Sequence, residues 1–294
     1  MAIHKPILVK EVLENLNVRA GGHYIDATVG EGGHAVGIAK RNASVLGIDQ
    51  DPAILEEAKI QIQEAGVGDR VKLAQGNFRE IDEISAESGF TDIDGILFDL
   101  GLSSWQLERS GRGFSFQKDE PLDMRADPNL KVTAADLLNG LTKDELEELF
   151  RKYGEEERAS QLAASIVRAR SLDPFFKTGD LIAAIEEVRG GGAGRQKLHP
   201  ATKIFQALRI AVNDEVENLR SVLPRAFGIL KPGGRMVVIS FHSLEDREVK
   251  RFFMEMGREC LGLILTRRPI RPSVEEVLIN PRCRSARLRV IEKK

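Results

Sequence analysis

The sequence predicts an α/β fold in which a mostly parallel sheet is covered by helices on both faces and is interrupted by a helical insertion. Short apolar or β-branched runs alternate with helical patterns over residues 24–100, and the alternation resumes after residue 213. Between residues 106 and 213 this rhythm stops, and helical patterns dominate. We therefore expect residues 1–107 and 212–294 to form the sheet domain, and residues 108–211 to form a helical insertion.

Composition limits the class of protein. The 294 residues suffice for one large or two modest domains, and 42% hydrophobic with 30% charged residues is typical of a soluble globular protein. The net charge of −2 provides no bulk attraction to nucleic acid or anionic membrane. Charge is uneven, however, because Arg258–Lys294 contains ten Lys/Arg and four Glu. That stretch could bind phosphate or could simply be a solvated face.

Cysteine usage and hydropathy indicate a cytoplasmic protein. Cys260 and Cys283 are too few for a disulfide framework or a cysteine-rich zinc site, and we expect no metal. Cys283 lies in a basic segment and could be reactive, although a plain small residue is the favoured interpretation. No secretory signal and no apolar run of membrane-spanning length is visible.

The first half of the chain predicts an amphipathic helix, two strand–helix units and two further strands. Pro52 suits the first turn of a helix, and Gly66 suits the position after its end. The predicted helices are His4–Leu16, His34–Arg41 and Asp51–Gly66, and the predicted strands are Tyr24–Ala27, Val45–Asp49, Val71–Gln75 and Ile93–Leu100.

The second half predicts the insertion and then the rest of the sheet. Thr142 and Glu145 form a capping box that opens a helix ending near Gly154. Further predicted helices are Glu156–Arg170, Gly179–Arg189, His199–Asn213, Asp214–Leu230 (closed by the turn Lys231–Gly234) and Leu244–Met256 (capped by Gly257), and the predicted strands are Arg235–Phe241, Leu261–Thr266 and Ala286–Ile291.

The stretch Tyr24–His34, YIDATVGEGGH, predicts a strand, a glycine-rich turn and a helix, which together form a cradle for a nucleotide-like ligand. Asp26 and Glu31 flank this turn, and no Lys or Arg lies between Tyr24 and Lys40. Two carboxylates disfavour a pyrophosphate and favour a cation. We therefore expect S-adenosyl-L-methionine, which carries a sulfonium and no phosphate, over NAD. An NAD-dependent oxidoreductase remains the alternative enzyme.

Polar or aromatic residues fall at the carboxyl ends of the four predicted strands in the first half, where α/β sheets bind ligands: Asp26, Asp49, Phe78 and Asp99. Asp49, which ends the second strand, is placed to hold a ribose, although an ordinary strand-end carboxylate is the alternative. Phe78 either contacts adenine or belongs to the core.

Several long motifs resemble one family across nearly the whole chain. They are HKPILVKEVL, DATVGEGGH, GIDQDP, DLGLSS, GRGFSF, PLDMR, HPATKIFQALRIAVN, LKPGGR, SFHSLEDR and NPRCRSARLRV. Together they resemble the ribosomal RNA small subunit methyltransferase H family within the class I S-adenosylmethionine-dependent methyltransferases. The resemblance implies a Rossmann-like, mostly parallel seven-stranded sheet and N4-methylation of a decoding-centre cytosine in 16S ribosomal RNA of the small ribosomal subunit.

The resemblance also implies a set of site residues. The cofactor contacts fall on Gly32, Gly33, His34, Asp49, Phe78, Asp99 and Gln106. For His34 we favour contact through the backbone amide rather than the ring. A monomer and a homodimer are both compatible with the sequence. A non-catalytic ribosome-assembly factor with a vestigial cofactor site is the third interpretation.

For the chemistry, we expect Asp99 to orient the cofactor or the target, with Ser103 or Ser104 near the base. Trp105 could stack on a flipped base or simply pack. His242 could act as a base, touch RNA or be a hydrogen-bonded structural residue. The helical insertion 108–211 is the best candidate for recognising the RNA. Within it, Arg195 and Lys197 could bind phosphates or belong to a solvated linker. Neither cysteine follows the fourth strand, so the covalent route used for ring-carbon methylation is not expected.

Overall fold

A seven-stranded sheet organises the larger of two structural units. This computed structural model describes residues 6–189 and 200–294. The first unit joins Met1–Ser103 with Val216–Lys294, and Ser104–Glu215 forms the second. The strands are β1 (His23–Asp26), β2 (Ser44–Asp49), β3 (Val71–Gln75), β4 (Ile93–Asp99), β5 (Leu230–Ser240), β6 (Gly262–Ile264) and β7 (Arg287–Lys293).

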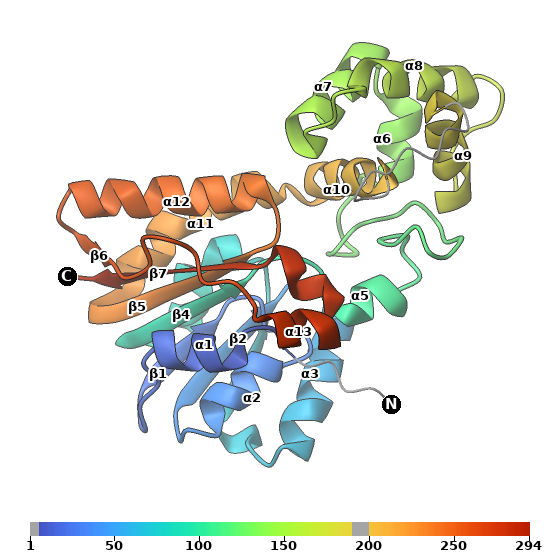
Figure 1. The fold of residues 1–294 in the computed structure, drawn as a ribbon. Helices are drawn as coiled ribbons and strands as arrows, with labels where there is room; N and C mark the ends of the chain where they lie inside the picture. Colours follow the sequence, from blue (N-terminus) through green and yellow to red (C-terminus); the bar gives the residue numbers. More distant parts are fainter. Residues whose placement is uncertain (1–5, 190–199) are drawn as a thin grey trace. The chain divides into compact units, whose positions relative to one another are not determined.

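The strand order is β3-β2-β1-β4-β5-β7-β6 (Figure 1). The first five strands in this order are parallel, whereas β7 is antiparallel to both β5 and β6. The order of the parallel strands reverses between β1 and β4, and ligands of such sheets bind outside the carboxyl ends at this switch point. The predicted α/β class with a mostly parallel seven-stranded sheet is confirmed.

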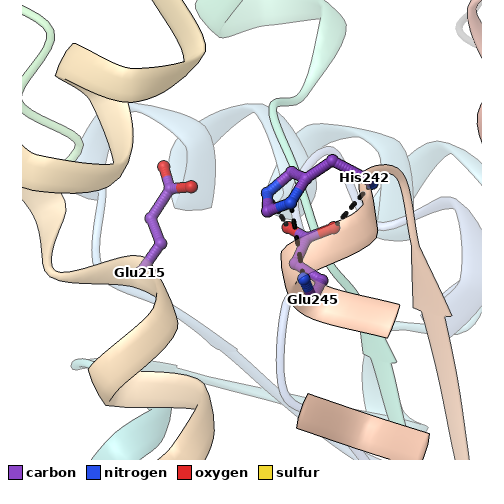
Figure 2. Close-up of side chains that lie close together, drawn as sticks. All are labelled: Glu215, His242 and Glu245. Atoms are coloured by element: carbon purple, nitrogen blue, oxygen red, sulfur yellow. Dashed lines mark hydrogen bonds and ion pairs between the residues drawn. The ribbon is translucent and has the colours of Figure 1, made fainter. Parts of the chain in front are cut away.

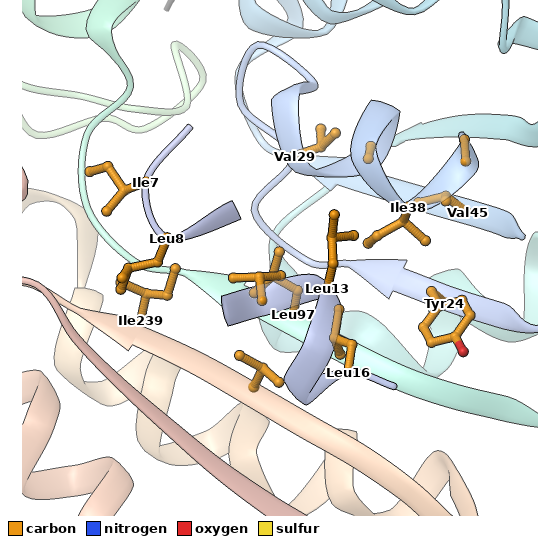
Figure 3. Close-up of a cluster of buried hydrophobic side chains, with 14 of the residues drawn as sticks. Ile7, Leu8, Leu13, Leu16, Tyr24, Val29, Ile38, Val45, Leu97 and Ile239 are labelled. Carbon is orange, nitrogen blue, oxygen red and sulfur yellow. The ribbon is translucent and has the colours of Figure 1, made fainter. Parts of the chain in front are cut away.

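Alternate strand residues enter two different cores, as the two-residue period of a strand requires. Tyr24 and Leu97 belong to the core beneath α1 (Val9–Asn15), α2 (Gly33–Ala39) and α3 (Pro52–Glu64), part of which Figure 3 shows. Their neighbours Ile25 and Phe98 belong to the opposite core. That second core is covered by α4 (Ile81–Glu87), α11 (Glu215–Ile229) and α12 (Ser243–Arg258). Both faces of the sheet are therefore buried.

The second unit is helical. Its helices are α5 (Ser104–Glu108), α6 (Ala134–Gly140), α7 (Lys143–Gly154), α8 (Ala159–Arg170), α9 (Thr178–Arg189) and α10 (Pro200–Asn213). The predicted capping box of α7 is confirmed, because Thr142 Oγ1 accepts from the Glu145 amide and the Glu145 carboxylate accepts from the Thr142 amide. The long loop between α5 and α6 is fastened by the buried side chain of Asn213, which accepts from the Ala126 amide at 2.7 Å and donates to the Met124 carbonyl at 2.8 Å.

Two predicted features are wrong in detail. Lys231–Gly234 does not close α11 as a separate turn but lies inside β5, where the register jumps from Ile93↔Leu230 to Gly95↔Arg235. A bulge absorbs these residues, helped by the positive φ of +76° at Gly233. Gly257 does not cap α12, because the helix continues to Arg258 and the left-handed residue beyond it is Cys260.

The sequence does not predict the short helices α4, α5, α6 and α13 (Val274–Ile279), since five to seven residues show too little of a helical period. The structure divides the chain a few residues outside the expected insertion 108–211, and the role of that insertion in RNA recognition remains a prediction. Among the described residues, no helix combines the length and the apolar character that crossing a membrane requires.

Candidate cofactor site at the carboxyl ends of the strands

The turn between β1 and α2 needs glycine at two consecutive positions. Gly32 has a φ of +89°, which L-residues with a side chain rarely adopt, and its amide donates to the Val29 carbonyl at 2.8 Å. At Gly33 the constraint is space, because an added Cβ would lie 2.8 Å from Cγ of Pro6. Backbone conformation therefore favours glycine at position 32, and the close packing of Pro6 favours it at position 33.

Three carboxylates follow β1, β2 and β4, which are neighbours in the sheet. Asp49 accepts from the Gly30 amide at 3.1 Å and from the Asp51 amide at 3.0 Å, so it is fixed against the glycine turn. The amide of Asp99 donates to Oγ1 of Thr28 at 2.6 Å. The third carboxylate, Asp26, is fully buried. The sequence prediction that these strand ends carry the polar site agrees with this placement.

The ring of His34 lies among these acids. His34 is only 4% exposed, and its Nε2 atom is 3.4 Å from Oδ2 of Asp99. The sequence favours a contact through the His34 amide, and the ring position adds a contact that the sequence does not indicate. Within this site, three side chains have buried polar atoms without a hydrogen-bond partner in the described part of the chain, among them Asp26 Oδ2, Asp99 Oδ1 and Nδ1 of His34. Buried polar groups are normally satisfied, so these atoms mark a place where a polar ligand fits.

Proton affinities in the site are high. Burial raises the pKa of Asp26 to about 7, against the opposing effect of His34 and with the help of Asp99. Burial likewise raises the pKa of Asp49 to about 6, opposed by its hydrogen bonds to the Asp51 and Gly30 amides. For His34, burial lowers the pKa, but the hydrogen bond to Asp99 and the charges of Asp99 and Asp26 outweigh it and raise the pKa. A cation entering the site would favour the ionised carboxylates.

Phe78 stands at the end of β3 in a short 3₁₀ helix, Phe78–Glu80. Its ring meets Phe98 edge-on with 5.9 Å between centroids, and it remains only half-buried. The ring therefore packs against the core, as one of the two interpretations expects, and is still partly exposed. Its contact with adenine stays a prediction.

The DLGLSSWQ stretch spans the boundary between the two units. Ser103 ends the part that belongs to the sheet unit, and Ser104, Trp105 and Gln106 belong to α5 in the helical unit. Gln106 is buried within α5. The guanidinium of Arg112 lies over the Trp105 ring, 5.7 Å from its centroid, so one face of this ring is already occupied. The roles of these residues toward cofactor and base stay predictions.

His242 is the N-cap of α12 (Figure 2). Its Nδ1 accepts from the Glu245 amide at 3.4 Å, its Nε2 lies 3.1 Å from Oε1 of Glu245, and the Glu245 carboxylate accepts from the His242 amide at 3.2 Å. The ring and the carboxylate thus form a capping box. This arrangement corresponds to the structural interpretation of His242, while a contact with RNA stays a prediction.

The remaining predicted residues divide into three groups. Arg195 and Lys197 lie outside the described residues. Cys260 is exposed. Cys283 is fully buried, and burial raises the pKa of its thiol, which favours the plain structural interpretation.

Two residues near the site have contacts that the sequence does not indicate. Thr28 positions the Asp99 amide, and Glu276 on α13 accepts from the Leu8 amide at 2.7 Å. The negative charge of Glu276 also helps to raise the pKa of His34. Neither residue has a spacing signal, because each acts on a partner that is distant in the sequence.

The sequence comparisons point to one family. A sequence model described as the MraW methylase family matches residues 1–294. A ribosomal RNA small subunit methyltransferase H of Heliobacterium modesticaldum is 46% identical over 99% of this chain and 98% of its own length. A protein of the same name from Thermomicrobium roseum is 47% identical over 99% of this chain and 93% of its own length. A crystal structure of a putative rRNA-methylase from Clostridium thermocellum is 13% identical and has a TM-score of 0.49 over 99% of this chain and 100% of that chain.

Proposed function

This chain belongs to the MraW methylase family, and we propose that it uses S-adenosylmethionine to methylate the exocyclic N4 of a decoding-centre cytosine in 16S ribosomal RNA. The observation that carries the proposal is the group of carboxylates at the carboxyl ends of β1, β2 and β4, which receives no Lys or Arg from the adjoining turn. Such a site suits a cationic methyl donor and disfavours a dinucleotide pyrophosphate. The relatives' names identify small-subunit ribosomal RNA as their substrate.

The chain offers a residue for each part of the cofactor. Asp49 would hold the ribose hydroxyls from the end of β2, and the half-open ring of Phe78 would lie against adenine. The glycine turn with its positive φ at Gly32 would border the amino-acid portion, with Asp26 able to accept from its ammonium group. When bound, the cofactor supplies an electrophilic methyl group on sulfur.

The protein has to prepare N4 of cytosine, whose lone pair is delocalised into the ring. We propose that Oδ1 of Asp99 accepts a hydrogen bond from the N4 amino group, because this oxygen is buried and has no partner among the described residues. His34, 3.4 Å from the other oxygen, would fix the orientation of the carboxylate. Asp99 would accept the proton that N4 loses when it takes up the methyl group. Positioning would supply most of the rate enhancement.

The decisive experiment is transfer of a tritiated methyl group from S-adenosylmethionine to unmodified small-subunit RNA or to small subunits that lack the modification. Digestion to nucleosides and mass spectrometry should give N4-methylcytidine. Label at the cytosine ring carbon would refute the chemistry proposed for Asp99. Absence of transfer to either substrate, with retained binding of S-adenosylhomocysteine, would instead support a non-catalytic assembly factor.

A further inference from the structure

The segment that connects β6 to β7 carries an unusual set of arginines. Residues 265–286 contain five arginines and two glutamates. Arg267, Arg268, Arg271 and Arg284 are all exposed, and none of these four makes a side-chain hydrogen bond or ion pair with any residue in the described part of the chain. Other arginines of the same unit are paired: Arg289 and Arg287 contact Asp246 at 2.6 and 3.1 Å, and Arg235 contacts Glu292 at 2.9 Å.

Strand directions place this segment at the edge of the sheet that carries the candidate site. β7 is antiparallel to β5 and to β6, so β6 ends and β7 begins where β5 ends, as the pairing of Ser240 with Arg287 shows. Because β1, β2, β4 and β5 are parallel, that edge also carries Asp26, Asp49 and Asp99. The exposed arginines therefore belong to the same rim as the carboxylates.

Contacts between α13 and the N-terminal segment connect this rim to the glycine turn. Glu276 of α13 accepts from the Leu8 amide at 2.7 Å. Pro6, two residues earlier, lines a cavity of about 280 Å³ together with α13 residues and also covers Gly33. The charge of Glu276 acts on His34. The segment with the arginines thus borders the cofactor turn itself.

The backbone that carries the arginines is anchored. Ile270 and Leu288 exchange two backbone hydrogen bonds of 2.9 Å, and Oγ1 of Thr266 accepts from the Val290 amide at 2.8 Å. Cys283 is fully buried in the core beneath α1, α2 and α3. Arg267 and Arg268 lie between the first two anchors, and Arg284 follows the third. Binding a ligand here would cost less backbone ordering than binding by an unanchored loop.

We propose that this arginine rim, formed by Arg267, Arg268, Arg271 and Arg284, binds phosphates of the small-subunit ribosomal RNA that flanks the target nucleotide. The inference rests on the proposed function. These four cations form no ion pairs with the described residues, and they lie on an anchored segment beside an acidic pocket. They would complement the charge of a polyanion whose target base must enter that pocket. The guanidinium group suits bidentate contact with phosphate oxygens, and such contacts position a nucleic acid without reading its sequence. The acidic pocket itself would repel phosphates. The RNA phosphates would therefore bind at the rim, and the cofactor would bind in the pocket.

The test compares two quadruple variants of the full chain. The first removes the rim: Arg267→Gln, Arg268→Gln, Arg271→Gln and Arg284→Gln. The control removes four exposed cations that also lack ion pairs within the described residues but lie away from this edge: Lys40→Gln, Lys59→Gln, Arg258→Gln and Lys294→Gln. Both variants lose the same net charge. Affinity for unmodified small-subunit RNA is measured from 50 to 300 mM salt, affinity for S-adenosylhomocysteine is measured in parallel, and methyl transfer is followed at limiting and saturating RNA.

The rim variant should bind RNA more weakly by roughly 10- to 100-fold at low salt, with a salt slope smaller by about 3, whereas the control should change both much less. Affinity for S-adenosylhomocysteine should be unchanged in both. Methyl transfer by the rim variant should fall at limiting RNA and recover toward the wild-type rate at saturation. Equal RNA affinities of the two variants would refute the phosphate-binding role of the arginine rim. Weaker binding to assembled subunits alone, with unchanged binding to naked RNA, would also overturn it and would assign the surface to a ribosomal protein.

These outcomes are separable from the fate of the proposed function. If the wild-type protein methylates RNA and the rim variant binds RNA like the control, the proposed function is supported and the phosphate-binding role of the rim is refuted. If the wild-type protein transfers no methyl group, but the rim variant alone loses RNA affinity and salt dependence, the role of the rim is supported and the proposed function is refuted. If the wild-type protein does not bind RNA, both the proposed function and the role of the rim are refuted.

Discussion

The Nε2 atom of His34 lies 3.4 Å from Oδ2 of Asp99, at the point where the strand order of the sheet reverses. His34 belongs to the helix after β1, and Asp99 ends the neighbouring strand β4. The contact orients one carboxylate oxygen and leaves the other buried without a partner among the described residues. A carboxylate held in this way can serve the target amine directly, which leads to the first prediction.

Replacing Asp99 should slow the chemical step. Asp99→Asn keeps the size of the side chain but removes the charge that accepts the N4 hydrogen, so single-turnover methyl transfer should fall by about 10²- to 10³-fold. The rate of the Asp99→Ala variant should fall by at least as much. Binding of S-adenosylhomocysteine serves as the control for cofactor affinity. Wild-type single-turnover rates in both variants would rule out this role.

Cofactor binding should depend on pH because protons compete with a cationic ligand. With pKa values of about 7 for Asp26 and about 6 for Asp49, lowering the pH from 7.5 to 5.5 neutralises these carboxylates. Protonation of His34, whose pKa is raised, adds positive charge as the pH falls through that pKa. Affinity for S-adenosylmethionine should therefore rise with pH by up to about tenfold per unit for each coupled proton.

S-adenosylhomocysteine carries a neutral sulfur and should show a shallower dependence than S-adenosylmethionine. Titration calorimetry at pH 5.5, 6.5 and 7.5 measures both ligands. Asp26→Asn should flatten the curve for S-adenosylmethionine, because the group that titrates near pH 7 is gone. Identical pH profiles for the two ligands would contradict an electrostatic role for the carboxylates.

The glycine turn offers a matched pair of substitutions. Gly32 and Gly66 both have positive φ, at +89° and +69°. An added Cβ would make ordinary contacts of 3.5 Å with Ala58 at Gly32 and would meet nothing within 4 Å at Gly66. Alanine at either site should lower the free energy of unfolding by about 1–2 kcal/mol through backbone strain. Only Gly32→Ala should also weaken binding of S-adenosylhomocysteine, and equal ligand affinities would exclude the turn from the site.

Asp246 should stabilise the sheet unit in a pH-dependent way. Burial raises the pKa of its carboxyl, but the hydrogen bonds and charges of Arg289 and Arg287 outweigh this and lower the pKa below its usual value. The stabilisation is therefore present above about pH 4, the unfolded-state value, and is lost as the pH falls through the lowered folded-state value. Asp246→Asn should lower the free energy of unfolding by about 2–4 kcal/mol at pH 7, because it leaves Arg289 buried without a counter-charge.

Urea unfolding at pH 7 and pH 3 measures this effect, and the difference between variant and wild type should shrink at the lower pH. Glu217→Gln is the control. Glu217 pairs with Arg220 at the surface and is half-exposed, so its loss should cost less than about 1 kcal/mol. An Asp246→Asn effect as small as that of the control would show that the pair with Arg289 contributes little.

The sequence predicts well the elements whose signal is local. Val71–Gln75 is the observed β3, and Thr142 with Glu145 opens α7, because a period of two and a capping box are both contained in a few residues. Lys231–Gly234 has an equally clear turn signal, yet its pairing with β4 draws it into β5. Tertiary pairing decides such cases, and a local pattern does not report it.

The candidate site divides in the same way. The strand-end acids Asp26, Asp49 and Asp99 follow from the alternation of strands and helices. The ring of His34 does not, because its position depends on packing between α2 and the end of β4. Arg112 over Trp105 likewise joins a helix to a loop that has no periodic pattern. Side-chain direction is therefore the part that the sequence leaves open.

The helical unit separates β4 from β5 in the sequence, although these strands are neighbours in the sheet. Pairing Asp99 with Ile239 therefore requires closing a very long loop, and the entropy of that closure grows with the number of unfolded residues in between. A helical unit that folds early would shorten the effective loop. Contact order then implies that helix-weakening substitutions in Ser104–Glu215 should slow refolding of the sheet, even where they leave its equilibrium stability unchanged.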